Sequence, residues 1–208
     1  MPADARKSVA DYRAIAAQYD HATRRINGVR RDAVAALELQ PGDTVMDVGC
    51  GSGFSFGPIL ECIGPSGRLL AFDHSPELLR IAEGRIANAG WKNVVLKEST
   101  AAAIRFDSPA CALLFSYVHD VLQTGAALEN LLGQASPRAR VAICGTKLWP
   151  WWGVPVNLYL HVTHRHYITN RNENFRTPWT KVARRLDNFQ VHVRWPPGWR
   201  FLATGNVR

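Results

Sequence analysis

Short apolar runs alternate along the chain with longer stretches in which apolar residues recur every three or four positions. The runs predict buried strands over 44–48, 68–73, 94–97, 110–117 and 140–144. A helix is expected from Phe54 onward and another around 128–132. A third has Ser75 as its N-cap, Pro76 at its first position and Gly90 at its end. Strands that alternate with helices predict an α/β fold with a parallel sheet.

Both ends of the chain carry further patterns. Tyr12, Ile15, Ala16 and Tyr19 recur at helical spacing after Ser8 and predict an amphipathic helix. Near the other end, Thr177-Pro178 predicts the start of a short helix with one apolar side, formed by Trp179, Val182, Ala183 and Leu186. Residues 189–195 and 199–204 alternate about Pro196-Pro197-Gly198, which predicts a closing hairpin.

The most informative motif is a glycine-rich loop. Gly49, Gly51 and Gly53 follow the first strand and Asp47 directly, and glycine lets the backbone approach a ligand closely. A dinucleotide site has the spacing G-x-G-x-x-G, whereas the third glycine comes one residue earlier here. A carboxylate at Asp47 would repel a pyrophosphate but attract an ammonium group. Asp73 ends the second strand, 20 residues after Gly53, where it can accept both ribose hydroxyls.

With these features the chain resembles the class I S-adenosylmethionine-dependent methyltransferases, whose first motif has the form hydrophobic-hydrophobic-acid-hydrophobic-Gly-x-Gly-x-Gly. The resemblance implies a Rossmann-like sheet of seven mostly parallel strands with a C-terminal antiparallel hairpin, and S-adenosylmethionine as the cofactor. The cofactor-binding residues that we expect are Tyr19, Asp47, Gly49, Cys50, Gly51, Gly53, Asp73, His74, Thr100, Ala101 and Ser116.

Two parts of this set rest on the resemblance alone. In methyltransferases similar to those of quinone and menaquinone biosynthesis, the loop after the third strand often reads G-D-A-E-x-L-P-F, and its acid contacts the adenine amino group. Residues 99–106 read S-T-A-A-A-I-R-F, so Thr100 offers a weaker hydroxyl bond or a neighbouring backbone group takes over. Relatives also carry a Tyr-Asp pair like Tyr19-Asp20 in a helix over the cofactor; the alternative for Tyr19 is a core aromatic.

Candidate catalytic residues follow the fourth strand. Because ligands bind beyond the carboxyl ends of parallel strands, Ser116, Tyr117 and His119 should arrive beside the methyl donor. His119, with an ordinary pKa near 6.5, is a candidate general base, with Tyr117 beside it. The alternative for His119 is a structural role at a helix start that Asp120 caps. Methyl transfer by direct displacement depends mainly on alignment, and a base is needed only for a protonated nucleophile.

Charge and composition narrow the partners. The net charge of +8 divides into +4 over residues 1–31, −4 over 32–144 and +8 over 145–208. The basic C-terminal third suits an anionic substrate, a phospholipid surface or RNA, but its cations are dispersed, which favours a solvated face. The four cysteines show no C-x-x-C spacing, so we expect buried thiols and no metal. With no signal peptide and no apolar run of about 18 residues, we expect a cytoplasmic protein.

The region after Gly145 is unusually aromatic, with six of the seven tryptophans. Trp149, Trp151 and Trp152 follow the fifth strand at the expected crevice edge, where they would form a substrate wall, a membrane contact or a plug of the core. Three histidines (His161, His164 and His166) follow among tyrosines. Without an acidic partner they favour an acceptor pocket over a metal site.

We therefore expect a methyltransferase that transfers a methyl group by in-line displacement to a small-molecule or lipid-like acceptor. The acceptor would approach from the side of Tyr117, His119 and Trp151. One domain should span 1–208, with N-terminal lid helices in 1–40, the cofactor-binding core in 41–146, and a substrate-side segment and hairpin in 147–208. The alternatives are an RNA methyltransferase, a non-catalytic partner protein that binds the donor, and, against the glycine spacing, a nicotinamide-dependent oxidoreductase. The acceptor's identity, the atom methylated and the oligomeric state stay open.

Overall fold

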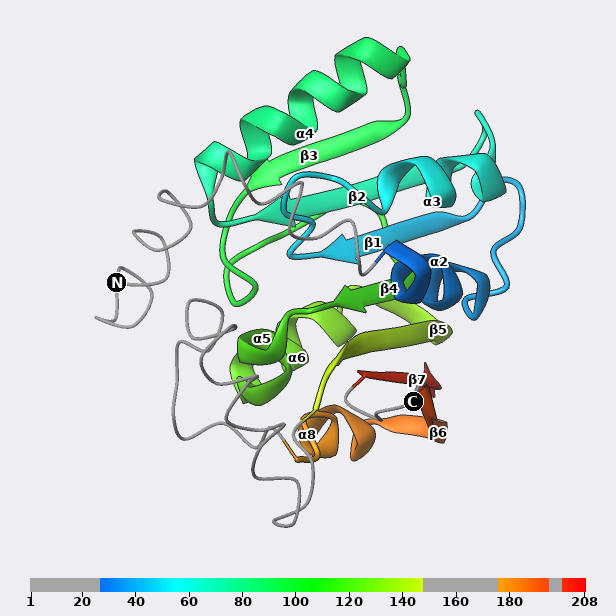
Figure 1. Ribbon diagram of the computed structural model, residues 1–208, viewed down its shortest axis with the longest axis vertical. Coiled ribbons are helices and arrows are strands. Elements are labelled where there is room, and N and C mark those ends of the chain that lie inside the picture. Colours follow the sequence, from blue (N-terminus) through cyan, green and yellow to red (C-terminus); the bar gives the residue numbers. More distant parts are fainter. Residues whose placement is uncertain (1–26, 148–175, 195–199) are drawn as a thin grey trace.

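The computed structural model describes residues 27–147, 176–194 and 200–208 (Figure 1). Their helices are α2 (Asn27–Ala35), α3 (Phe56–Ile63), α4 (Pro76–Ala89), α5 (His119–Gln123), α6 (Gly125–Leu132) and α8 (Thr180–Ala183). Their strands are β1 (Thr44–Val48), β2 (Arg68–Asp73), β3 (Val94–Glu98), β4 (Ala110–Ser116), β5 (Ala135–Thr146), β6 (Leu186–Arg194) and β7 (Arg200–Val207).

The strands form one seven-stranded sheet in the order β3-β2-β1-β4-β5-β7-β6, from the top to the bottom of Figure 1. Strands β1 to β5 are parallel to one another, and β7 pairs antiparallel with both β5 and β6. The predicted Rossmann-like sheet and closing hairpin are therefore confirmed. The strand order reverses between β1 and β4, and a ligand crevice is expected beyond the carboxyl ends of the strands at such a point.

Helices cover both faces of the sheet because successive strand residues point to opposite sides. On β1, Val45 packs in the cluster that holds the apolar residues of α2 and α3 together with Ala82 of α4. Its neighbour Met46 packs in the other cluster, with Leu122 of α5, the apolar face of α6 and Val182 of α8. The two clusters form a three-layered core and leave the carboxyl ends of β1, β2 and β4 at one edge.

Helix α4 has the termini that its sequence predicts. The Ser75 side chain accepts a hydrogen bond from the Leu78 amide (3.4 Å), Pro76 occupies the first turn, and Gly90 ends the helix in the left-handed conformation with φ 70°. These groups satisfy backbone donors and acceptors that a helix end leaves unpaired. They also fix the start of α4 directly after Asp73, at the end of β2.

Several expected boundaries are wrong. Strand β5 runs over Ala135–Thr146 and is not limited to residues 140–144. Helix α3 begins at Phe56 and not at Phe54, because Gly53 has φ 79°, which a right-handed helix does not accept. Tyr117 lies outside β4 with φ 61°. Leu186 begins β6, where it pairs with Val207, and does not continue the short helix α8; here strand pairing overrides the helical pattern.

Some expectations fall outside the described residues. These are the helix around Tyr12–Tyr19, the tryptophans at 149, 151 and 152, the histidines at 161, 164 and 166, and the turn at 195–199. Within the described ranges, no helix is long and apolar enough to cross a membrane. The same ranges hold no cluster of three potential metal-ligating side chains.

Candidate functional site

The glycine loop between β1 and α3 adopts a backbone that side chains disfavour. Gly49, Gly51 and Gly53 all have positive φ, at 59°, 55° and 79°. A Cβ at Gly49 would lie 2.6 Å from the Val118 side chain, and one at Gly53 would lie 2.8 Å from the Phe56 ring. Both spacings are far below van der Waals contact, so conformation and packing each require glycine at 49 and 53.

Asp73 joins this loop to the end of β2. Its side chain is buried, with Oδ2 accepting a hydrogen bond from the Gly51 amide (2.8 Å) and Oδ1 accepting one from the Ser75 amide (2.9 Å). Burial raises the pKa of the carboxyl, against the opposing effects of the nearby His74 and of these backbone amides. Each carboxylate oxygen has two acceptor positions, so Asp73 retains the capacity to accept further donors such as ribose hydroxyls.

Asp47 lies behind the loop, near the end of β1, and is 1% exposed. Its Oδ2 accepts no hydrogen bond from the part of the chain that the structure describes. Burial raises its pKa to about 7, while the charge of Arg30 lowers it and that of Asp73 raises it. A buried carboxylate oxygen without a donor is costly, so this arrangement calls for a cationic or hydrogen-donating ligand.

Arg30 reaches this carboxylate from α2 and was missed by sequence reasoning. Its guanidinium is almost fully buried, its Nε donates to Ser116 Oγ (3.3 Å), and it lies over the rings of Phe54 and Tyr117, 5.2 and 5.7 Å from their centroids. The Arg30-Arg31 pair fits no motif, and only the fold shows that Arg30 turns inward while Arg31 is exposed.

Arg30 and Asp47 line one small cavity of about 20 Å³, together with Gly49, Cys50, Ser52, Phe54, Ser55 and Ser116. This volume holds about one water molecule. The cavity therefore presents a carboxylate and a guanidinium side by side, which is the complement of a zwitterionic amino-acid group. The amino-acid end of S-adenosylmethionine fits this donor set chemically, but its entry requires side chains around the cavity to move.

The two candidate catalytic residues lie at the ends of β4 and β5. Tyr117 has a positive φ, which is strained for an aromatic residue, and its buried hydroxyl has no hydrogen-bond partner among the described residues. Burial raises its pKa, so the phenol is neutral near pH 7. His119 begins α5, and its Nε2 lies 2.7 Å from the Thr146 carbonyl. That contact requires the proton on Nε2 and leaves the Nδ1 lone pair as the basic site.

Other expected site residues also gather near Asp73. His74 lies beside it, with Nδ1 3.6 Å from Oδ1. The amide of Ser99 donates to the Asp73 carbonyl (3.0 Å), which brings the following Thr100 and Ala101 to the same edge. Cys50 lies in the loop, and burial raises the pKa of its thiol, which makes it a poor nucleophile. Tyr19 lies outside the described residues.

Sequence comparisons place the donor half of the chain among methyltransferases. The family model for protein-L-isoaspartate(D-aspartate) O-methyltransferase matches residues 12–103, less than half of the chain. A protein-L-isoaspartate O-methyltransferase of Aeropyrum pernix is 37% identical over 68 residues, 33% of this chain and 26% of that protein. A demethylmenaquinone methyltransferase of Anoxybacillus flavithermus is 29% identical over 77 residues, 37% of this chain and 32% of that protein. The chain thus spans about a quarter to a third of these curated relatives.

The fold is shared with a solved methyltransferase. A solved S-adenosylmethionine-dependent methyltransferase from Aquifex aeolicus superimposes with a TM-score of 0.58 at 19% identity, covering 86% of this chain and 89% of that one. The donor half of the chain is thus similar in sequence to S-adenosylmethionine-dependent methyltransferases, and the sheet has the fold of the class I enzymes. This class implies S-adenosylmethionine as the cofactor. The class I glycine loop is the one described above, with its acid at Asp47 and the second acid at Asp73.

The buried carboxyl group of Asp47 predicts that the stability of the protein depends on pH. Its pKa is about 7 in the folded state and 3.8 for an unperturbed Asp, so the folded state holds a proton that the unfolded state releases. Stability is therefore lost as pH rises between these two values. Asp47→Asn has no group that titrates here and does not suffer this loss. We therefore expect the free energy of unfolding of the variant, relative to that of the wild type, to be about 2 kcal/mol higher at pH 8 than at pH 5. Urea unfolding of both proteins at the two pH values measures it. A difference that stays constant with pH would contradict the assignment.

Proposed function

We propose that the protein is an S-adenosylmethionine-dependent methyltransferase that acts on a small-molecule or lipid-like acceptor. The observation that carries the proposal is the pair of buried carboxylates around the glycine loop: Asp73 bound to its backbone, and Asp47 behind it opposite Arg30. Each carboxylate suits a different part of one ligand. A nucleoside alone would leave Asp47 and Arg30 unused, and a dinucleotide would set a pyrophosphate against Asp47.

In this proposal the two ends of the donor are held by different elements. Asp73 accepts the ribose hydroxyls with the acceptor positions that Gly51 and Ser75 leave open. Asp47 accepts the α-ammonium group, and Arg30 pairs with the α-carboxylate while Ser116 holds its guanidinium. Because the glycine loop, β2 and α2 are fixed by the core, these groups need little reorganisation to orient the donor.

When bound, S-adenosylmethionine supplies a methyl group on a positively charged sulfur. The residues of this chain orient that group towards the acceptor and exclude water. Tyr117 and His119 would line the acceptor side, since both follow β4 at the same edge as the loop. Burial lowers the pKa of His119, so the imidazole is neutral at pH 7 and can accept a proton at Nδ1 if the acceptor must lose one.

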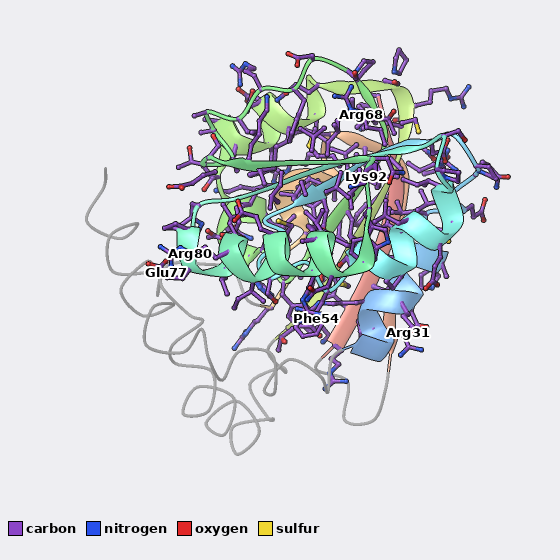
Figure 2. The ribbon with its side chains drawn as sticks, turned by 90° about the horizontal axis from the view of Figure 1, so that it is seen from above. Arg31, Phe54, Arg68, Glu77, Arg80 and Lys92 are labelled. Atoms are coloured by element: carbon purple, nitrogen blue, oxygen red, sulfur yellow. The ribbon has the colours of Figure 1, made fainter. Side chains whose placement is uncertain are left out.

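A small acceptor is favoured over RNA by the surroundings of the C-terminal cations. Arg185 pairs with Glu129, Arg208 pairs with Asp187, and the Lys181 ammonium donates to the Gln123 carbonyl. Elsewhere, exposed cations such as Arg31, Arg68, Arg80 and Lys92 come from different elements and are spread over the molecule (Figure 2). A nucleic-acid surface would gather cations along one track.

The names of the relatives do not decide between acceptors. One relative is named for protein isoaspartate and the other for demethylmenaquinone, and the matched family model ends at residue 103, before Tyr117 and His119. The segment after β5 differs from the donor half in its tryptophans, which suit a planar or lipid-like acceptor. We therefore propose an acceptor of that kind.

Incubation with donor labelled in its methyl group and with a cell extract separated into lipids, small molecules, RNA and protein tests the proposal. We expect label in the lipid or small-molecule fraction, and none with Asp73→Ala. Label confined to RNA would favour the RNA methyltransferase, and label confined to protein would favour a protein acceptor. A protein that binds the donor but labels no fraction would be a non-catalytic partner.

His119 can be tested with the labelled fraction as substrate. His119→Gln keeps a side-chain N–H for the Thr146 carbonyl but has no basic nitrogen. If His119 is the base, turnover should fall about a hundredfold while donor affinity, measured by calorimetry, stays the same. Full turnover in His119→Gln, together with loss of stability in His119→Ala, would show that His119 only holds the ends of α5 and β5 together.

A further inference from the structure

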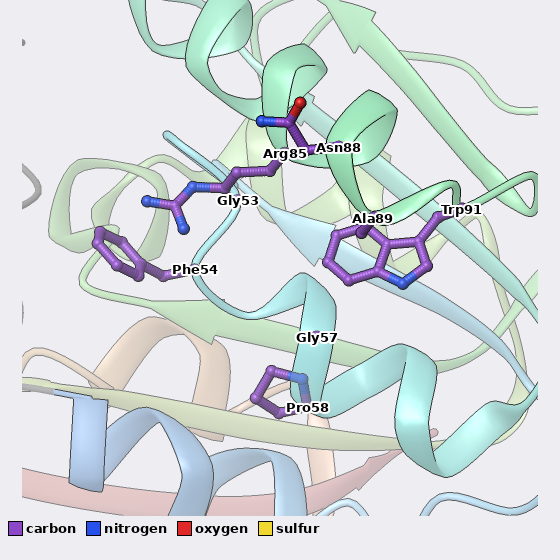
Figure 3. Close-up of a pocket in the computed structure, with 8 residues that line it drawn as sticks. All are labelled: Gly53, Phe54, Gly57, Pro58, Arg85, Asn88, Ala89 and Trp91. Atoms are coloured by element: carbon purple, nitrogen blue, oxygen red, sulfur yellow. The ribbon is translucent and has the colours of Figure 1, made fainter.

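A groove on the outer face of the molecule lies between α3 and α4, behind the glycine loop. Its volume is about 400 Å³, and its lining includes Phe54, Gly57, Pro58, Arg85, Asn88 and Trp91. Figure 3 shows Arg85 reaching from α4 towards the Phe54 ring at one end, and the Trp91 ring at the other. This size lies in the range of small-molecule sites. Gly53 and Phe54 of the glycine loop also line the groove, so it adjoins the donor site described above.

The groove has the chemistry of a site for a planar ring with a negative charge. The Arg85 guanidinium lies over the Phe54 ring, 4.3 Å from its centroid. The Trp91 ring is held edge-on against the buried Phe56, with centroids 6.4 Å apart, so its orientation is fixed from the core side. Asn88 adds an amide, and the lining contains one cation and no carboxylate.

Gly57 lines the groove beside the indole. A Cβ built on it would lie 4.0 Å from the Trp91 ring, which is ordinary contact, so any side chain larger than that of alanine would press against the indole and occupy this side of the groove. Gly57 is the second residue of α3, and its lack of a side chain keeps that side of the groove clear.

We propose that this groove binds a small planar aromatic carboxylate. The ring stacks on the groove side of Trp91, and the carboxylate pairs with the Arg85 guanidinium, whose planar fork matches two carboxylate oxygens. Asn88 donates its amide N–H to the same carboxylate.

The groove is coupled to the donor site through Phe54. Phe54 lines the groove and also the cavity that holds Asp47 and Arg30. Both guanidiniums, Arg85 from the groove and Arg30 from the cavity, lie over its ring. A ligand that draws Arg85 away from Phe54 therefore changes the wall of the donor cavity. This coupling rests on the proposed function, whereas binding in the groove does not.

The probe is 2-naphthoate, titrated by calorimetry against 2-naphthamide, which lacks the charge, and cyclohexanecarboxylate, which lacks the flat ring. We expect 2-naphthoate to bind at least about tenfold more tightly than either. Arg85→Met and Gly57→Leu should each weaken it by a similar factor. Gly84→Leu is the matched control, because Gly84 lies on α4 with open space around it, outside the groove lining. Thermal unfolding confirms that each variant folds.

Failure to bind 2-naphthoate at millimolar concentration, or equal binding by wild type and Gly57→Leu, would overturn the site. The coupling is measured by the affinity for S-adenosylhomocysteine with and without saturating 2-naphthoate. We expect saturating 2-naphthoate to change the affinity for S-adenosylhomocysteine by about threefold or more. S-adenosylhomocysteine should change the affinity for 2-naphthoate by the same factor. An unchanged affinity would overturn the coupling alone. If S-adenosylhomocysteine does not bind at all while 2-naphthoate does, the proposed function fails and the groove site stands.

Discussion

The carboxylate of Asp73 is the group on which the geometry of the site depends most. The glycine loop has three residues with positive φ, and glycine-rich backbone is costly to order. Asp73 holds it by accepting the Gly51 amide, and holds the start of α4 by accepting the Ser75 amide. Each such charge-assisted bond contributes about 1.5–3 kcal/mol. One side chain thus joins β2, the loop and α4, and it stands where the ribose of the proposed donor would bind.

Asp47, behind this loop, lowers the stability of the fold but provides a group that can bind a ligand. Asp47 is buried with a raised pKa, and one of its oxygens has no hydrogen bond among the described residues. Such a group destabilises a folded protein and is retained where a ligand needs it. Arg30, buried beside it on a different element, balances its charge only in part. The pair is thus prepared for a ligand that carries both a positive and a negative group at one end.

The sequence predicted the donor side of the fold well because its signals are local. The ends of β1 and β2, the glycine spacing and the cap at Ser75 each depend on a few neighbouring residues, and the structure has them where expected. Arg30 could not be predicted, because its role depends on how α2 packs against β4, β5 and β7. The helix expected through Leu186 failed for the same reason: its pairing partner, Val207, is distant in sequence. The expected donor and catalytic roles of individual residues stay predictions.

The most direct measurement is a calorimetric comparison of two ligands, S-adenosylhomocysteine and methylthioadenosine, which lacks the amino-acid end. If Asp73 holds the nucleoside and Arg30 holds the amino acid, Asp73→Ala should lose both ligands. Arg30→Met should then lose about tenfold or more for S-adenosylhomocysteine only, and its exposed neighbour Arg31→Met should change neither. Unchanged affinity of Asp73→Ala for both ligands would contradict the account.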